Sequence, residues 1–266
     1  MSFPMIGCLF NPALRSAGSY DLEMEFCEAA KSQLRATQSV MKAINEFYER
    51  QLTPEEIAAG EHRTFVGGLW HEIGALQFEF LRQSGLLPHH KLLDIGCGAL
   101  RCGIPIIEYL DSGNYYGVDI NASLVEAGKH ELEQKGLTSK QPHLLVNDKF
   151  EFDRFGISFD FAIAQSVFTH LDMNLIVRCF VQTRKALKSD GTFFSTFFLA
   201  PFPGHIATIK HQPGGTVTNF DTDPFHYSFR EIEWLAEISG LSARLIDDWN
   251  HPRNQKMIEL SAKLKE

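Results

Sequence analysis

The chain has 266 residues, enough for one or two domains at roughly 150 residues each. Hydrophobic residues make up 44% and charged residues 22% of it, an ordinary globular composition that excludes a disordered, collagenous or coiled-coil protein. Because the formal net charge is −8, the chain repels polyphosphates at long range, and we expect no nucleic-acid partner.

The spacing of the cysteines and the length of the apolar runs indicate where in the cell the protein is expected. None of the five cysteines shows a CxxC or Cys/His ligand spacing, so the sequence predicts neither a disulfide framework nor a metal site. The N-terminus has no basic start, and Pro4, Gly7 and Pro12 interrupt its apolar run, which is unlike a signal peptide. No stretch reaches the ~18–20 apolar residues of a membrane helix. We therefore expect a soluble, cytoplasmic protein without a membrane partner.

The first 88 residues are predicted to be helical. Residues 22–48 contain long helix-forming side chains and apolar residues at steps of three and four. Thr53, Pro54 and the two glutamates after them are typical of the opening of a short helix, and a third helix is expected over 69–83. Since no strand-like run occurs here, we expect residues 1–88 to form a helical cap or extension.

From Lys91 onward, short apolar runs alternate with helical segments. Strands are predicted over 91–95, 115–120, 143–146, 159–164, 192–199, 243–247 and 256–261. Helices are predicted over 100–110, 122–135, 173–187 and 229–239, with Asn121 and Asp172 as N-caps and Gly136 and Gly191 as C-terminal stops. This alternation predicts an α/β fold, a three-layer sandwich around a mainly parallel sheet.

Residues 200–227 interrupt the alternation. They contain four prolines, three glycines and three histidines. An insertion of this length in a compact domain is usually a lid or a binding loop. We therefore expect a main domain over 89–266 with a lid-like insertion at 200–227, whose phenylalanines, among them Phe225, favour an apolar or aromatic acceptor pocket.

The strongest chemical signal follows the first predicted strand, in residues 94–98 (DIGCG). Glycines in such a turn let the backbone approach a ligand closely, and the following helix offers N–H donors. A dinucleotide fingerprint would need a third glycine at position 101, where Arg101 stands. The acidic Asp94 also suits a cationic ligand better than a pyrophosphate. A purely structural glycine turn is the alternative.

Two further acidic positions follow in order. Asp119 ends the second predicted strand, where a carboxylate can accept hydrogen bonds from two ribose hydroxyls. Asp148 and Lys149 follow the third predicted strand, where a carboxylate can accept from an adenine amino group. An aspartate after a strand is often only a helix cap, but these positions reinforce one another.

Together these motifs resemble the class I S-adenosylmethionine-dependent methyltransferases, over about the last two thirds of the chain. The resemblance implies a seven-stranded sheet with an antiparallel last hairpin, and S-adenosylmethionine as a cofactor that leaves as S-adenosylhomocysteine. It also implies a set of cofactor-binding residues: Trp70, Asp94, Gly96, Cys97, Gly98, Arg101, Asp119, Ile120, Asp148, Lys149, Gln165 and Ser166.

Three of these residues have a second interpretation. Trp70 either closes over the cofactor or packs in a core. Arg101 pairs either with the cofactor carboxylate or with an acidic residue of the cap. Cys97 fits a small buried thiol better than a nucleophile.

The segment after the fourth predicted strand bears on the acceptor. Family members that methylate amino groups of nucleic-acid bases or of protein glutamine often have (Asp/Asn/Ser)-Pro-Pro-(Tyr/Phe) there, whereas residues 164–167 are AQSV. With the negative net charge, this favours a small-molecule acceptor, methylated on oxygen rather than on nitrogen or carbon. An RNA- or protein-modifying methyltransferase and a non-catalytic S-adenosylmethionine-binding module are the alternatives. The sequence does not decide whether the protein forms a homodimer.

A general base is needed only when the acceptor is a weakly acidic hydroxyl or a protonated amine, and histidine is the natural candidate near neutral pH. We name two candidate catalytic residues. His170 follows the fourth-strand segment, and His226 precedes the last predicted helix. A helix-entry residue bonded to the backbone is the alternative for His170.

Overall fold

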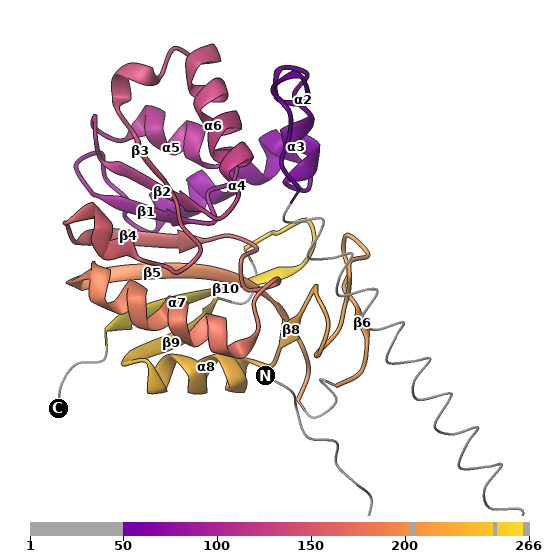
Figure 1. The fold of residues 1–266 in the computed structure, drawn as a ribbon. Coiled ribbons are helices and arrows are strands. Elements are labelled where there is room, and N and C mark those ends of the chain that lie inside the picture. The colour runs from indigo at the N-terminus through magenta and orange to yellow at the C-terminus, as the bar shows by residue number, and fades with distance from the viewer. Residues whose placement is uncertain (1–49, 203–205, 247–248, 263–266) are drawn as a thin grey trace, which may run out of the picture. The chain divides into compact units, whose positions relative to one another are not determined.

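The computed structural model describes residues 50–202, 206–246 and 249–262 (Figure 1). These residues belong to one compact unit that spans residues 48–266. The helix expected over 22–48 and the loop residue His205 lie outside the described residues. The predicted boundary at residue 88 stays a prediction.

Three helices precede the sheet: α2 (Pro54–Ala58), α3 (Glu61–Phe65) and α4 (Trp70–Gln83). The predicted opening of α2 is confirmed as a capping box, because Thr53 Oγ1 accepts from the Glu56 amide and the Glu56 carboxylate accepts from the Thr53 amide. α3 was not predicted, since it is short and its N-cap, Gly60, offers no side-chain hydrogen bond.

The sheet has the predicted mixed α/β architecture. Its main strands lie in the order β3-β2-β1-β4-β5-β10-β9, and β10 alone runs opposite to the other six. Their bounds are β1 (Leu92–Ile95), β2 (Tyr115–Asp119), β3 (His143–Val146), β4 (Phe159–Ala164), β5 (Leu187–Leu199), β9 (Leu241–Ile246) and β10 (Gln255–Ala262). The expected fold class is therefore confirmed, including the antiparallel last hairpin.

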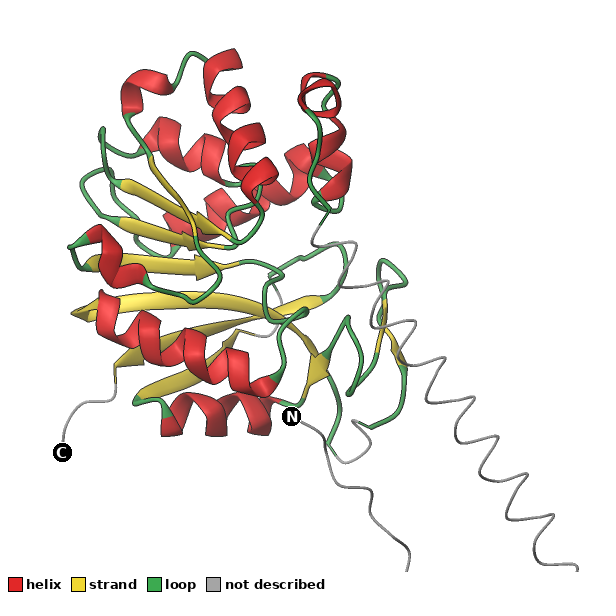
Figure 2. Cartoon of the chain, in the orientation of Figure 1, coloured by secondary structure: helices red, strands yellow, loops and turns green. Residues whose placement is uncertain are grey.

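Helices cover both faces of this sheet (Figure 2). They are α5 (Gly103–Tyr109), α6 (Ala122–Gln134), α7 (Met173–Ala186) and α8 (Phe229–Ile238), with 3-10 turns η1 (Thr138–Lys140) and η2 (Phe152–Phe155). Successive strand side chains point to opposite faces. Leu93 and Ile95 accordingly pack in the core under α7 and α8, whereas Leu92 packs in the core under α4 and α5. A parallel sheet buried on both faces explains the continuous apolar runs.

The ends of the helices follow the predicted caps with one exception. The predicted N-caps Asn121 and Asp172 accept backbone amides at the starts of α6 and α7, and Ser228 does the same at the start of α8. The prediction that Gly191 stops a helix is wrong, because Gly191 lies inside β5. A Cβ atom at Gly191 would stand 2.8 Å from the Phe159 carbonyl oxygen, so the irregular pairing of β4 with β5 requires glycine.

The insertion at 200–227 forms small strands of its own: β6 (Ile209–Lys210), β7 (Val217–Thr218) and β8 (His226–Tyr227). β6 pairs with β7, and β8 pairs in parallel with the end of β5. The Phe225 amide donates to the Thr169 carbonyl at 2.7 Å, which ties the insertion to the segment after β4. The insertion therefore adjoins the carboxyl ends of β4 and β5.

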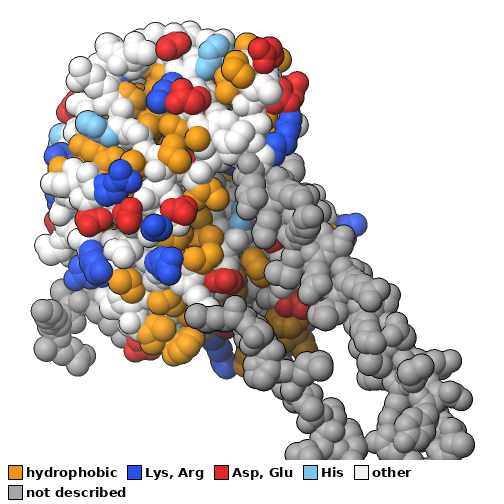
Figure 3. Space-filling view, in the orientation of Figure 1, with side chains coloured by type: hydrophobic (Ala, Val, Ile, Leu, Met, Phe, Trp, Pro, Cys, Tyr) orange, Lys and Arg blue, Asp and Glu red, His pale blue; other side chains and the backbone are white. Residues whose placement is uncertain are grey.

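The surface in Figure 3 shows acidic and basic side chains interspersed on the visible face. Within the described residues, no helix is both long and apolar enough to cross a membrane.

Candidate active site

The glycine turn after β1 packs against the segment after β4. Gly96 and Gly98 have φ of 70° and 52°, values that favour glycine. The Gly96 amide donates to the Val118 carbonyl at 2.8 Å, which fixes the turn beside the end of β2. A Cβ atom on Gly96 would stand only 2.5 Å from Val167 Cγ2. The turn therefore packs closely against the Val167 side chain at the carboxyl edge of the sheet.

Asp119 is held against this turn by its carboxylate. Oδ2 accepts from the Gly98 amide and Oδ1 from the Asn121 amide, both at 2.8 Å. Burial raises the pKa of Asp119, and these backbone amides oppose that effect. A carboxylate offers about four lone-pair positions, so each oxygen retains capacity for another donor. Beside it, the Ile120 side chain is 62% exposed and offers an apolar surface at the end of β2.

Asp94 and Cys97 are buried groups below the turn. Asp94 accepts a hydrogen bond from the Tyr115 hydroxyl at 2.6 Å, and burial raises its pKa to about 6. Burial also raises the pKa of the Cys97 and Cys102 thiols, which keeps both protonated near neutral pH. These environments agree with the interpretation of Cys97 as a small buried thiol, and Cys102 is a second one.

The turn after β3 is held by Asn147. Its side-chain oxygen accepts from the backbone amides of Lys149 and Glu151, both at 3.0 Å. Asp148 and Lys149 are exposed on this turn. Because β3 pairs with β2, with Val146 opposite Asp119, the turn lies next to the Asp119 carboxylate at the same edge.

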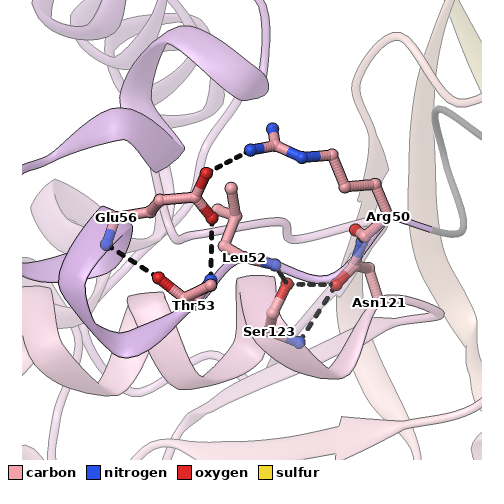
Figure 4. A network of polar contacts seen from close by, with 6 residues as sticks. All are labelled: Arg50, Leu52, Thr53, Glu56, Asn121 and Ser123. Atoms are coloured by element: carbon pink, nitrogen blue, oxygen red, sulfur yellow. Dashed lines mark hydrogen bonds and ion pairs between the residues drawn. The ribbon is translucent and has the colours of Figure 1, made fainter.

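Figure 4 shows how the segment before α2 is attached to this edge. The Asn121 side-chain amide donates to the Arg50 carbonyl, and the Leu52 amide donates to Ser123 Oγ, both at 2.9 Å. Asn121 Oδ1 in turn accepts from the Ser123 hydroxyl at 2.7 Å. The N-cap of α6 therefore also anchors residues 50–52.

Trp70 lies at the start of α4, packed beside the small core cluster of Leu52, Ala99, Leu124 and Ala127. Its ring meets His62 edge-on at 5.7 Å, and the Arg63 guanidinium lies 5.5 Å from the ring centroid. His62 and Arg63 both bind the buried carboxylate of Glu131 on α6. The observed contacts of Trp70 are thus packing contacts, and a cofactor contact stays a prediction.

Arg101 binds backbone rather than a carboxylate. Nη1 donates to the carbonyl oxygens of Val66 at 2.9 Å and Gly68 at 3.0 Å. Arg101 makes no ion pair with a described acidic residue of the expected cap. Pairing with a cofactor carboxylate stays a prediction.

A polar cluster occupies the edge at the ends of β4 and β5. It consists of Gln165, Ser166, Thr196, His251 and Gln255. Gln255 Oε1 accepts from Thr196 Oγ1 at 2.7 Å and from Ser166 Oγ at 3.0 Å. Ser166 has φ of 59°, and its amide donates to Thr196 Oγ1 at 2.7 Å, so the chain turns sharply here. Gln165 Oε1 is buried without a partner among the described residues.

His251 is a neutral member of this cluster. Its Nδ1 accepts from the Arg253 amide at 3.2 Å. Nε2 lies 3.1 Å from the Gln165 side-chain nitrogen. Burial, reinforced by the charges of Arg253 and Arg101, lowers the pKa of His251 to about 3. His251 is therefore neutral near neutral pH and does not serve as a base there.

The two predicted catalytic histidines lie in different settings. His170 is exposed, and its Nδ1 lies 2.8 Å from Asp223 Oδ1, an arrangement that can orient an imidazole. His226 is buried, with Nδ1 2.7 Å from Thr218 Oγ1. Their catalytic roles stay predictions.

Sequence reasoning missed His251, Arg253 and Gln255. All three lie in or beside the loop between the last two predicted strands. The available signal was topological, since an antiparallel last hairpin brings its connecting loop to the carboxyl edge of the parallel strands. Among the described residues, no group of three or more His, Cys, Asp or Glu is arranged to hold a metal ion.

Comparison with known proteins bears on this edge. Residues 93–193 match the model of a methyltransferase domain. The fold is similar to a putative O-methyltransferase of Nostoc punctiforme (20% identity, TM-score 0.59, 83% of this chain and 68% of that one). It is also similar to magnesium protoporphyrin IX methyltransferase of Synechocystis with bound SAM (15% identity, TM-score 0.52, 96% of this chain and 100% of that one). A third similar structure is a glycopeptide N-methyltransferase complexed with S-adenosylmethionine (12% identity, TM-score 0.56, 71% of this chain and 94% of that one). At these identities the likeness establishes the fold.

Proposed function

We propose that this protein is a class I S-adenosylmethionine-dependent methyltransferase that transfers a methyl group to a small-molecule acceptor, because residues 93–193 match the model of a methyltransferase domain. Two of the similar structures contain S-adenosylmethionine, which supports this cofactor. The observation that carries the proposal is the Asp119 carboxylate, fixed by the Gly98 and Asn121 amides at 2.8 Å beside the glycine turn.

The residues at this edge fit the cofactor. Asp119 would accept the ribose hydroxyls, Ile120 would pack against the adenine, and Asp148 with Lys149 would meet the adenine amino edge. The crowded Gly96 shows that a larger residue would disturb the turn where the methionine portion would bind. Gln165 and Ser166 would face the methyl group.

The mechanism asks little covalent chemistry of the protein. The cofactor, when bound, supplies an activated methyl group on a sulfonium. The glycine turn and Asp119 would hold the cofactor, and the polar cluster would orient the acceptor toward its methyl group. This positioning of the two reactants can supply much of the rate enhancement. The helices before β1 and the insertion would exclude water.

The choice of acceptor rests on three features. Segment 164–167 lacks the tetrapeptide of many amino-group methyltransferases, and the net charge is −8. The His170–Asp223 pair favours an oxygen acceptor, because an oriented imidazole can take a hydroxyl proton. Under the remaining alternative, a non-catalytic binding module, the cofactor would bind without turnover.

Calorimetric titration with S-adenosylmethionine, S-adenosylhomocysteine and NADH tests the cofactor. We expect micromolar binding of the first two and none of NADH. Screening hydroxylated aromatic acceptors for formation of S-adenosylhomocysteine then tests the reaction. Binding of NADH alone, or of no ligand, would contradict the methyltransferase proposal.

A further inference from the structure

Two guanidinium groups meet on one turn at the carboxyl edge. Arg101, just after the glycine turn, donates to the carbonyl oxygens of Val66 and Gly68. Arg253, in the loop between β9 and β10, donates from Nη2 to the carbonyl oxygen of Gly67 between them. Three successive carbonyl groups therefore bind cations that come from separate parts of the sheet.

Neither cation has an anionic partner among the described residues. The carboxyl group of Asp94 accepts from Tyr115 instead. Burial and the charge of Arg253 lower the pKa of Arg101 to about 10, whereas the charge of Asp94, which forms no ion pair with Arg101, has a smaller opposing effect. A partly buried cation without a counter-ion is costly, and an anion bound at the pair would relieve that cost.

The pair adjoins both halves of the candidate site. Arg101 follows the glycine turn, and Arg253 lies two residues from His251 and two from Gln255, whose side chains contact Gln165. The Arg253 amide itself donates to His251 Nδ1 at 3.2 Å. An anion at the two guanidinium groups would therefore lie next to the reacting groups.

We propose that Arg101 and Arg253 form a carboxylate-binding subsite of the active site. The inference rests on the proposed function and adds Arg253, from the far end of the chain, to the residues that bind ligand. A guanidinium has five N–H donors in a fork that matches a carboxylate, and the turn uses only one terminal nitrogen of each arginine. The carboxylate belongs either to the methionine portion of the cofactor or to the acceptor.

Two pairs of probes separate these sources. S-adenosylhomocysteine and its descarboxy analogue, 5′-S-(3-aminopropyl)-5′-thioadenosine, test the cofactor carboxylate. Benzoate and benzamide, titrated into the protein saturated with S-adenosylhomocysteine, test an acceptor carboxylate. Wild type, Arg253→Gln and Arg253→Lys are compared by calorimetry. Arg244→Gln is the matched control, because Arg244 is an exposed arginine of β9 that pairs with Glu259.

We expect Arg253→Gln to lower the affinity for one carboxylate at least about tenfold, with less than about twofold change for its neutral counterpart. Arg253→Lys keeps the charge but not the forked donor geometry, so its affinity for that carboxylate should lie between those of wild type and Arg253→Gln. Loss confined to S-adenosylhomocysteine assigns the subsite to the cofactor, and loss confined to benzoate assigns it to the acceptor.

Equal loss for a carboxylate and its neutral counterpart would show that Arg253 only holds Gly67, and would overturn the proposal. The proposal would also be overturned if Arg253→Gln left the affinity for S-adenosylhomocysteine unchanged and the wild-type protein bound benzoate no better than benzamide. Wild-type binding of S-adenosylmethionine tests the proposed function separately. If it is intact while the arginine variants behave like wild type, only the subsite fails.

Discussion

The two halves of the sheet's carboxyl edge are assembled differently. At β1, β2 and β3, each proposed ligand-binding group lies within a few residues of its own strand end. At β4, β5 and β10, the polar cluster joins residues 86 to 90 positions apart, as between Gln165 and His251 or Gln255. The first half is thus local in sequence, whereas the second exists only once the last hairpin has folded against β5.

The largest expected effect tests whether the first half depends on one carboxylate. Asp119→Ala should weaken S-adenosylhomocysteine binding by about 100-fold or more, because hydrogen bonds to a charged group contribute about 1.5–3 kcal/mol each. Calorimetry measures the affinity, and circular dichroism confirms that the variant folds. Asp153→Ala, an exposed carboxylate in η2, is the control. An Asp119→Ala protein that binds within threefold of wild type would refute the ribose assignment.

A second variant tests whether the acceptor half is separate. Gln255→Ala removes the acceptor of Thr196 Oγ1 and Ser166 Oγ, so the free energy of unfolding in urea should fall by about 2–3 kcal/mol. Affinity for S-adenosylhomocysteine should change less than about threefold. Ser242→Ala, on the exposed part of the same hairpin, should cost less than about 0.5 kcal/mol. If Gln255→Ala lost as much affinity as Asp119→Ala, the two halves would not be independent.

The smallest effect concerns the insertion beside the acceptor half. Burial, with the charge of His226, lowers the pKa of His211 to about 4, whereas an unfolded histidine titrates near 6.5. The unfolded chain therefore binds a proton first as the pH falls. The stability that neutral His211 contributes is complete above pH 6.5 and is lost between about pH 6.5 and 4.

His211→Asn should accordingly reduce the slope of unfolding free energy against pH in this window by about 1 kcal/mol per pH unit. Asp94 contributes to the slope with the opposite sign, since its pKa is raised to about 6. Its contribution is the same in both proteins and cancels in the difference. The exposed His71→Asn is the control. Identical slopes for wild type and His211→Asn would contradict the prediction.

The same contrast explains what the sequence could predict. β4 has the predicted bounds, because a buried parallel strand is a mainly apolar run between turn residues. The edge strand β3, which is only partly buried, also has its predicted bounds. Gly191 was misassigned, because its role depends on the carbonyl of Phe159 on another strand. Asp119 was recognisable from its position after a strand, whereas nothing near His251 or Gln255 in the chain indicates that they meet Gln165.

Asn121 gives the cofactor half a consequence beyond its own strands. Its amide binds Asp119, while its side chain binds the Arg50 carbonyl and, through the Ser123 hydroxyl, adjoins the Leu52 amide. A ligand that orders Asp119 therefore also restrains the point where the chain enters the domain. Slower hydrogen–deuterium exchange at the Leu52 amide would report occupancy of the site from outside it.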